Sequence, residues 1–192
     1  MPVVSTDGAT IFVGSHDYKL YALDALTGAQ KWFKAFGRYQ SAVAVSPDGG
    51  TIFVGSADTK KVYCRNASTG AEKWSFETGG ALWSSPAISQ DGGTIFVGSA
   101  DNKVYALNAL SGSEMWSFAA GNLIQASPAV SPDGSNVFVG SNDNKVYAIS
   151  TGSITVCSFD GSKRCPDPSP CAAGTYSSNG LKFFGAGSCQ AC

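Results

Sequence analysis

The segment Phe-Val-Gly-Ser occurs four times in this chain of 192 residues, beginning at Phe12, Phe53, Phe96 and Phe138. The starting points lie 41, 43 and 42 residues apart. A repeat of this period indicates stacked supersecondary units, each of which buries its apolar surface only against its neighbours. The fold therefore has to be one that multiplies a single unit of about 42 residues.

Each repeat consists of short β-type segments separated by turn residues. In the third repeat, residues 94–99 and 103–108 are rich in β-branched and aromatic side chains. Asp101 and Asn102 between them predict a type I′ hairpin, because both residue types tolerate positive φ. Strands at 85–89 and 114–118 complete the unit, and frequent Gly and Pro exclude helical repeats. The sequence predicts an all-β fold, a partial β-propeller of four four-stranded antiparallel blades with a small disulfide-rich C-terminal tail.

We expect two regions, the propeller repeats in residues 1–159 and a cysteine-rich segment in residues 160–192. Residues 3–8 match the interior of later repeats, so we expect the chain to start inside a repeat. We also expect neighbouring domains to be missing at both ends. The net charge of −1 offers no basic face, which argues against nucleic-acid binding. No apolar run approaches the roughly 18–20 residues of a membrane span, and the N-terminus does not resemble a signal peptide.

The carboxylates recur with the repeat and therefore make poor catalytic candidates. Asp7 returns as Asp48, Asp91 and Asp133, each time followed by glycine. A catalytic pair is built once, so residues that recur in every repeat are expected to form turns. The only histidine, His16, falls at a hairpin position where other repeats have alanine or asparagine. We expect no catalytic residue, no metal ligand and no cofactor-binding residue.

A longer motif carries a family resemblance. Residues 21–32 read Tyr-Ala-Leu-Asp-Ala-Leu-Thr-Gly-Ala-Gln-Lys-Trp, and the pattern returns at 63–74 and 105–116. The pattern Ala-x-Asp-x-x-Thr-Gly-x-x-x-Trp resembles the repeat of the quinoprotein-dehydrogenase-like propellers, the PQQ-like repeat family, over residues 3–159. The resemblance implies inter-blade wedges in which tryptophans contact turn glycines and a carbonyl of the next blade. These residues are Trp32, Trp74, Trp116, Gly28, Gly70 and Gly112.

The fourth repeat departs from this motif. It is two residues shorter after Tyr147, and we expect Val156 at the tryptophan position and the end of the array near Phe159. By resemblance, quinoprotein dehydrogenases use calcium, a disulfide between adjacent cysteines and about eight blades. This chain has no adjacent cysteines and four repeats, so we expect no quinone cofactor.

Five of the six cysteines lie in the last 36 residues, which suggests a disulfide module and an oxidising compartment. Zinc is the alternative, since Cys189-x-x-Cys192 has ligand spacing, but a second close pair is missing. Residues 171–192, with Cys-x-x-Gly-Thr-Tyr-Ser followed by Cys-x-x-Cys, resemble the ephrin-receptor-like cysteine-rich repeats. In that setting we predict a Cys171–Cys189 disulfide, with Cys157–Cys165 as a second pair.

Two further positions in the repeats are candidates for chemistry. Cys64 stands where other repeats have alanine, and we expect a buried thiol without a partner. Asn66-Ala67-Ser68 is a glycosylation sequon if the chain is secreted, although Asn66 alternatively caps the turn as Asp24 does.

Three functions remain open from the sequence. The first is a non-enzymatic extracellular or cell-surface scaffold or recognition module with a protein or glycan partner. The alternatives are a fragment of a quinoprotein oxidoreductase and the sensor ectodomain of a receptor or kinase. The tail favours the extracellular setting, and the repeated turns without a unique site favour the first function.

Overall fold

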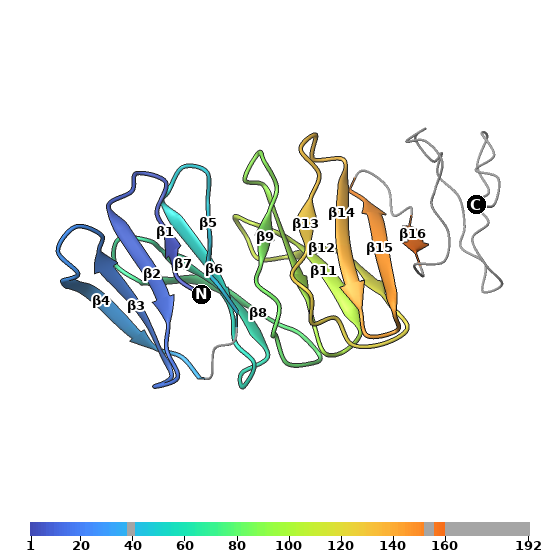
Figure 1. Cartoon of the computed structure of the whole chain (residues 1–192), viewed down its shortest axis with the longest axis horizontal. Coiled ribbons are helices and arrows are strands. Elements are labelled where there is room, and N and C mark those ends of the chain that lie inside the picture. Colours follow the sequence, from blue (N-terminus) through green and yellow to red (C-terminus); the bar gives the residue numbers. More distant parts are fainter. Residues whose placement is uncertain (38–40, 152–155, 160–192) are drawn as a thin grey trace.

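The chain folds into four sheets, each of four antiparallel strands, which follow one another along the long axis of the molecule (Figure 1). The computed structural model describes residues 1–37, 41–151 and 156–159, the last as strand backbone. Strand order in every sheet follows sequence order. The predicted all-β fold with four strands per repeat is confirmed, and the cysteine-rich tail lies outside the described residues. No helix in the described part of the chain is long and apolar enough to span a membrane.

We call the sheets blades 1 to 4. Blades 1 and 2 comprise β1 (Val3–Val4), β2 (Thr10–Gly14), β3 (Lys19–Asp24), β4 (Gln30–Ala35), β5 (Ala44–Val45), β6 (Thr51–Gly55), β7 (Lys61–Asn66) and β8 (Glu72–Glu77). Blades 3 and 4 comprise β9 (Ala87–Ile88), β10 (Thr94–Gly98), β11 (Lys103–Asn108), β12 (Glu114–Ala119), β13 (Ala129–Val130), β14 (Asn136–Ser141), β15 (Lys145–Ser150) and β16 (Val156–Phe159).

The hairpin between the second and third strands of a blade is not the predicted type I′ turn. In blade 3 the Asn102 N–H donates to the Ser99 carbonyl at 3.2 Å. Asn102 has a φ of 72°, whereas Asp101 is not among the residues of positive φ. A type I turn followed by one left-handed residue fits this pattern. The Asp101 carboxylate also accepts the Lys103 N–H at 3.0 Å, a local bond that stabilises this turn.

The core lies between the blades, because successive residues of a strand point to opposite sides of its sheet. We call the side of a blade that contacts the next blade its forward face, and the opposite side its backward face. Phe12 and Leu20 on the forward face of blade 1 share a buried cluster with Ile52 and Val54 on the backward face of blade 2. Equivalent clusters join blades 2 and 3, and blades 3 and 4.

Blade 4 differs from the others at its last strand. Trp116 of β12 pairs with Ala106, whereas in blade 4 the equivalent Ala148 pairs with Cys157 of β16. The expectation that Val156 holds the tryptophan position is therefore wrong. In blades 1 to 3 a register shift follows this pair, and in blade 4 Ile149 and Val156 continue the ladder without one. Blade 4 lacks the extra residue that forms the bulge in the other blades. The residue opposite Ala148 is therefore Cys157, one position later than expected.

Candidate functional site

Tryptophans on the outer strands close two of the boundaries between blades. The indole N–H of Trp32 donates to the Ala67 carbonyl of blade 2 at 3.0 Å, and the indole N–H of Trp74 donates to the Ala109 carbonyl of blade 3 at 3.0 Å. A Cβ on Gly70 would lie 2.8 Å from the Trp32 ring. Only glycine allows so close an approach, and these tryptophans therefore connect each blade to the next.

Of the remaining wedge positions, Trp116 also packs at a blade boundary, whereas Gly28 does not. Trp116 is half-buried, its ring centre lies 5.9 Å from that of Phe96, and it packs against the buried clusters between blades 3 and 4. Gly28 is exposed, and a Cβ added to it would meet nothing within 4 Å. Gly28 belongs to blade 1, against whose backward face no blade of the described chain packs. The wedge contacts are therefore structural.

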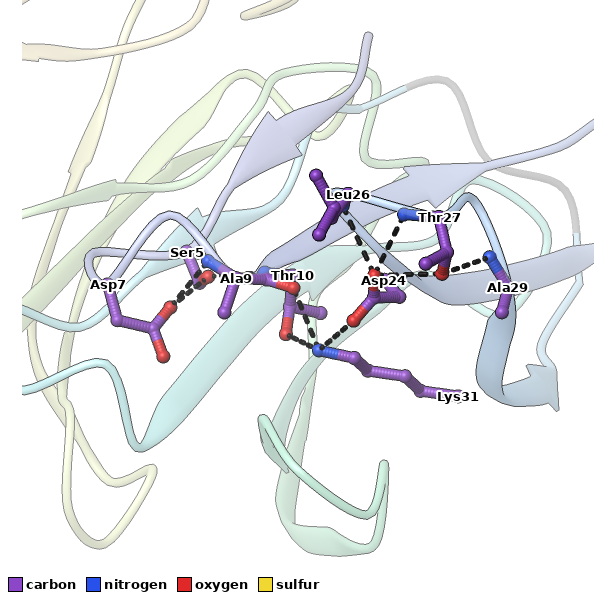
Figure 2. Close-up of polar contacts among 9 residues, drawn as sticks. All are labelled: Ser5, Asp7, Ala9, Thr10, Asp24, Leu26, Thr27, Ala29 and Lys31. Carbon is purple, nitrogen blue, oxygen red and sulfur yellow. Dashed lines mark hydrogen bonds and ion pairs between the residues drawn. The ribbon is translucent and has the colours of Figure 1, made fainter.

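The first and third turns of each blade lie together on one edge of the molecule, which we call the turn face. In blade 1 the Ala25 N–H donates to the Ala9 carbonyl at 3.1 Å and joins the two turns. Figure 2 shows how Lys31 spans them. Its Nζ donates to the Ala9 carbonyl at 2.8 Å and lies 3.5 Å from an Asp24 carboxylate oxygen. In blade 1 the two turns are thus connected by a side chain of the blade itself.

Each first turn of the turn face presents an aspartate held by a serine. In blade 4 the Ser131 hydroxyl donates to Asp133, and the same serine accepts the Asn136 N–H at 2.9 Å. The hydrogen bonds from Ser131 and Ser135 lower the pKa of Asp133 to about 2. Serine hydrogen bonds likewise lower the pKa of the other three aspartates. The exposed set is Asp7, Asp48, Asp91 and Asp133.

The third turns are capped by acceptor oxygens, as proposed for Asn66. Its Oδ1 accepts the Ser68 N–H at 3.0 Å and the Thr69 N–H at 2.9 Å. Asp24 and Asn108 accept equivalent bonds in blades 1 and 3. Asn66 therefore caps its turn, and a glycan on its amide nitrogen remains a prediction.

Among the described residues, two grooves open on the turn face between neighbouring blades. The larger, of about 560 Å³, lies between blades 3 and 4, and the smaller, of about 250 Å³, lies between blades 1 and 2. Asp91 and Asp133 stand on the two sides of the larger groove, with Gln90, Thr94, Phe96 and Thr151 also in its lining. The lining is thus mainly hydroxyls, amides and carboxylates, with an aromatic ring among them.

Aspartates of the opposite edge hold the blades together. Asp101 accepts the Tyr105 hydroxyl at 2.6 Å and the Gly79 N–H at 2.8 Å, which ties blade 3 to the connection from blade 2. Burial and the hydrogen bond to Asp101 raise the pKa of Tyr105. Asp143 repeats the arrangement with Tyr147 and Gly121. These carboxylates are therefore structural.

The other candidates from the sequence do not gather into a site. His16 is exposed in the first hairpin, and Cys64 is buried with its thiol pKa raised by burial to about 11. Within the described ranges, no group of three or more His, Cys, Asp or Glu residues is arranged to hold a metal ion. Cys165, Cys171 and Cys189 lie outside the described residues, and of Cys157 only the backbone is described.

The sequence reasoning missed Arg65, which is 9% exposed at the boundary between blades 1 and 2. Its guanidinium donates to the Gly70 carbonyl at 2.9 Å and to Glu72 at 3.0 Å, and its carbon lies 4.3 Å from the Phe36 ring centre. The signal was present, because other repeats have leucine or isoleucine at this position. Arg65 therefore places a charge where the other blades have an apolar side chain. The Gly70 carbonyl and Glu72 of the same blade accept hydrogen bonds from part of its guanidinium.

Comparison with known proteins gives a consistent result. A family model described as outer membrane protein assembly factor BamB matches residues 16–155. The crystal structure of BamB from Moraxella catarrhalis is similar, with a TM-score of 0.70 and 22% sequence identity. The match covers 81% of this chain and 47% of that chain, so this chain spans about half the length of that BamB. At this identity the likeness shows the fold. None of the curated proteins compared with the chain matches it.

Proposed function

The chain belongs to the PQQ-like repeat family whose model is described as outer membrane protein assembly factor BamB, and from this premise we propose that it is a non-enzymatic scaffold that binds another protein. The family description names an assembly factor, which suits a protein that holds others in place. The observation that carries the proposal is the turn face, where exposed carboxylates held by serine hydrogen bonds border two grooves.

The carboxylates of this face suit recognition better than catalysis. A general acid or base works best with a pKa near the operating pH. The serine hydrogen bonds instead lower the pKa values of Asp91 and Asp133, so both remain charged at neutral pH. Fixed anionic acceptors on both sides of the larger groove favour a partner segment that presents lysine or arginine.

Site-specific cross-linking tests this proposal. A photoreactive phenylalanine in place of Gln90, in the lining of the larger groove, should capture a defined protein partner in material from the source organism. The same residue in place of Lys60, an exposed hairpin residue on the opposite edge, is the matched control. The double variant Asp91→Asn, Asp133→Asn keeps the turn acceptors but removes both charges, and it should reduce capture several-fold. Equal capture from both positions would argue against the turn face.

Two outcomes would support other functions. Binding on a glycan array, with no protein captured, would assign the face to a glycan. Quinone absorbance retained through gel filtration after reconstitution with pyrroloquinoline quinone and calcium would favour the oxidoreductase alternative. The non-enzymatic proposal expects no retained absorbance.

We further propose an extracellular or cell-surface location, which rests on the cysteines of the tail. A Cys171–Cys189 disulfide would close a loop in the unfolded chain and so stabilise the folded tail by about 3 kcal/mol by the chain-entropy estimate. Peptide mapping under non-reducing conditions should recover this pair from secreted material. Recovery of both cysteines as free thiols would remove the main reason for this location.

A further inference from the structure

Blade 4 exposes the forward face that blades 1 to 3 bury. Phe138 is 39% exposed, whereas the phenylalanines at the same position of the first three blades are each 1% exposed. Val146 is 45% exposed, whereas its counterparts are fully buried. Those counterparts are Phe12, Phe53 and Phe96 for Phe138, and Leu20, Val62 and Val104 for Val146. An apolar face built for contact with another blade is therefore uncovered by the described chain.

Blade 1 exposes the complementary backward face. Val13 is partly exposed, whereas the valines at its position in blades 2 to 4 are at most 2% exposed. Phe33 is 46% exposed and lies on this face, because it pairs with Tyr21 across β3 and β4 at a ring distance of 6.0 Å. Blades 2 and 3 have Ser75 and Ser117 at that position. The blade whose backward face is open is thus the one that gains an aromatic ring there.

The two open faces fit each other as the internal faces do. Phe53 and Val97 are the counterparts of Phe138 and Val13, and they share one buried cluster between blades 2 and 3. Tyr105 and Tyr147 contact Phe76 and Phe118 on the last strand of the preceding blade, and Tyr63 contacts Phe36, which directly follows β4. Tyr21, on blade 1, contacts Phe33 of its own blade instead. A forward face placed against blade 1 would therefore repeat a contact that the chain already makes three times.

The described residues do not bring these faces together, since blades 1 and 4 lie at opposite ends of the molecule (Figure 1). We propose that a second copy of this chain covers both, with the forward face of blade 4 in each copy against the backward face of blade 1 in the other. Two such joints form a closed ring with twofold symmetry. Two sets of four sheets make eight blades, at the upper end of the range common for propellers.

Analytical ultracentrifugation of the full chain, with reductant present so that tail cysteines cannot link copies, tests the proposal. The expected species has twice the 19.8 kDa mass of the chain. Phe138→Lys and Val13→Glu should each weaken dimerisation about 100-fold, because each leaves an unpaired charge in both joints. Leu110→Lys is the control, since Leu110 is 91% exposed on the turn face, outside both joints. Circular dichroism should show unchanged strand content, because all three positions are exposed or partly exposed in a single copy.

Mixing the two charged variants distinguishes a head-to-tail ring from other dimers. A mixed dimer has one unaltered joint and one joint in which the introduced lysine meets the introduced glutamate. Equimolar mixing should therefore restore dimerisation that neither variant shows alone. A wild-type chain that remains monomeric at about 100 μM overturns the proposal. This holds both if the tail of the same chain covers the two faces and if they stay uncovered. A dimer that survives Val13→Glu, or a mixture that stays monomeric, overturns it as well.

Discussion

The ring of Trp74 lies so close to the backbone of Gly112 that a Cβ on residue 112 would stand 2.6 Å from it. Gly112 is buried and has a φ of 75°, a conformation that side chains with a Cβ rarely adopt. The indole N–H of Trp74 donates to the Ala109 carbonyl three residues earlier in the same turn. The tryptophan of one blade and the glycine of the next therefore form one structural unit.

Trp74→Ala should lower the free energy of unfolding by about 3 kcal/mol, because the ring fills the boundary between blades 2 and 3. Trp74→Phe should cost less, since it keeps most of the apolar contact and loses the bond to the Ala109 carbonyl. Denaturant unfolding of both variants measures the difference. A loss below about 1 kcal/mol for Trp74→Ala would mean that the ring contributes little to the boundary.

Gly112→Ala should cost more stability than Gly28→Ala, although the two glycines share a turn position and nearly the same φ, 75° and 71°. Both substitutions introduce backbone strain of about 1 kcal/mol. Only the one at 112 also collides with a tryptophan, which should add about 1–3 kcal/mol. Thermal unfolding at concentrations where the chain is monomeric compares them. Equal losses would show that the strain alone matters.

The aspartates of the turn face should make the fold sensitive to acid. The folded pKa of Asp133, about 2, lies below its ordinary value of 3.8, so its contribution to stability is present above pH 4. That contribution is lost as the pH falls from about 4 toward 2. Ser131→Ala should move the Asp133 pKa back toward 3.8 in an NMR titration. Ser113→Ala, at an exposed serine that contacts Ser111, should leave the Asp133 titration unchanged.

Cys64 should resist alkylation while the chain is folded. Burial raises the pKa of its thiol from 9.0 to about 11, so the thiolate fraction at pH 8 falls by about 100-fold. Iodoacetamide labelling followed by peptide mass spectrometry should show reaction at Cys64 only after unfolding in urea. Cys64→Ala should be tolerated, because Ala22 and Ala106 occupy the same position. Equal labelling rates in the folded and unfolded chain would contradict the burial.

Local sequence signals were sufficient for the blades themselves. The segment 103–108 was expected as a strand and is β11 (Lys103–Asn108), and the segment 94–99 contains β10 (Thr94–Gly98). Alternating apolar residues and Gly or Asp turns act over a few residues, so they can be read without knowledge of the rest of the fold. For the same reason the turn-capping role of Asn66 was one of the two alternatives considered.

Features that depend on hydrogen bonds between strands were predicted less well. Asp101 and Asn102 suit a type I′ turn by residue type, but only Asn102 has positive φ. Val156 was expected at the tryptophan position, and the ladder places Cys157 there because blade 4 lacks the bulge. Register is set by pairing with the neighbouring strand, and a missing residue changes it in a way that counting along the chain does not show.

Sequence alone determined that this protein is an array of four antiparallel β-repeats joined by tight turns, because each repeat carries its own alternation and its own turn residues. It could not determine which apolar side chains are buried. Phe12 and Phe138 begin the same four-residue segment, yet one is 1% exposed and the other 39%. Only the tertiary structure decided this, because a residue on a blade face is buried by the adjacent blade and not by its own.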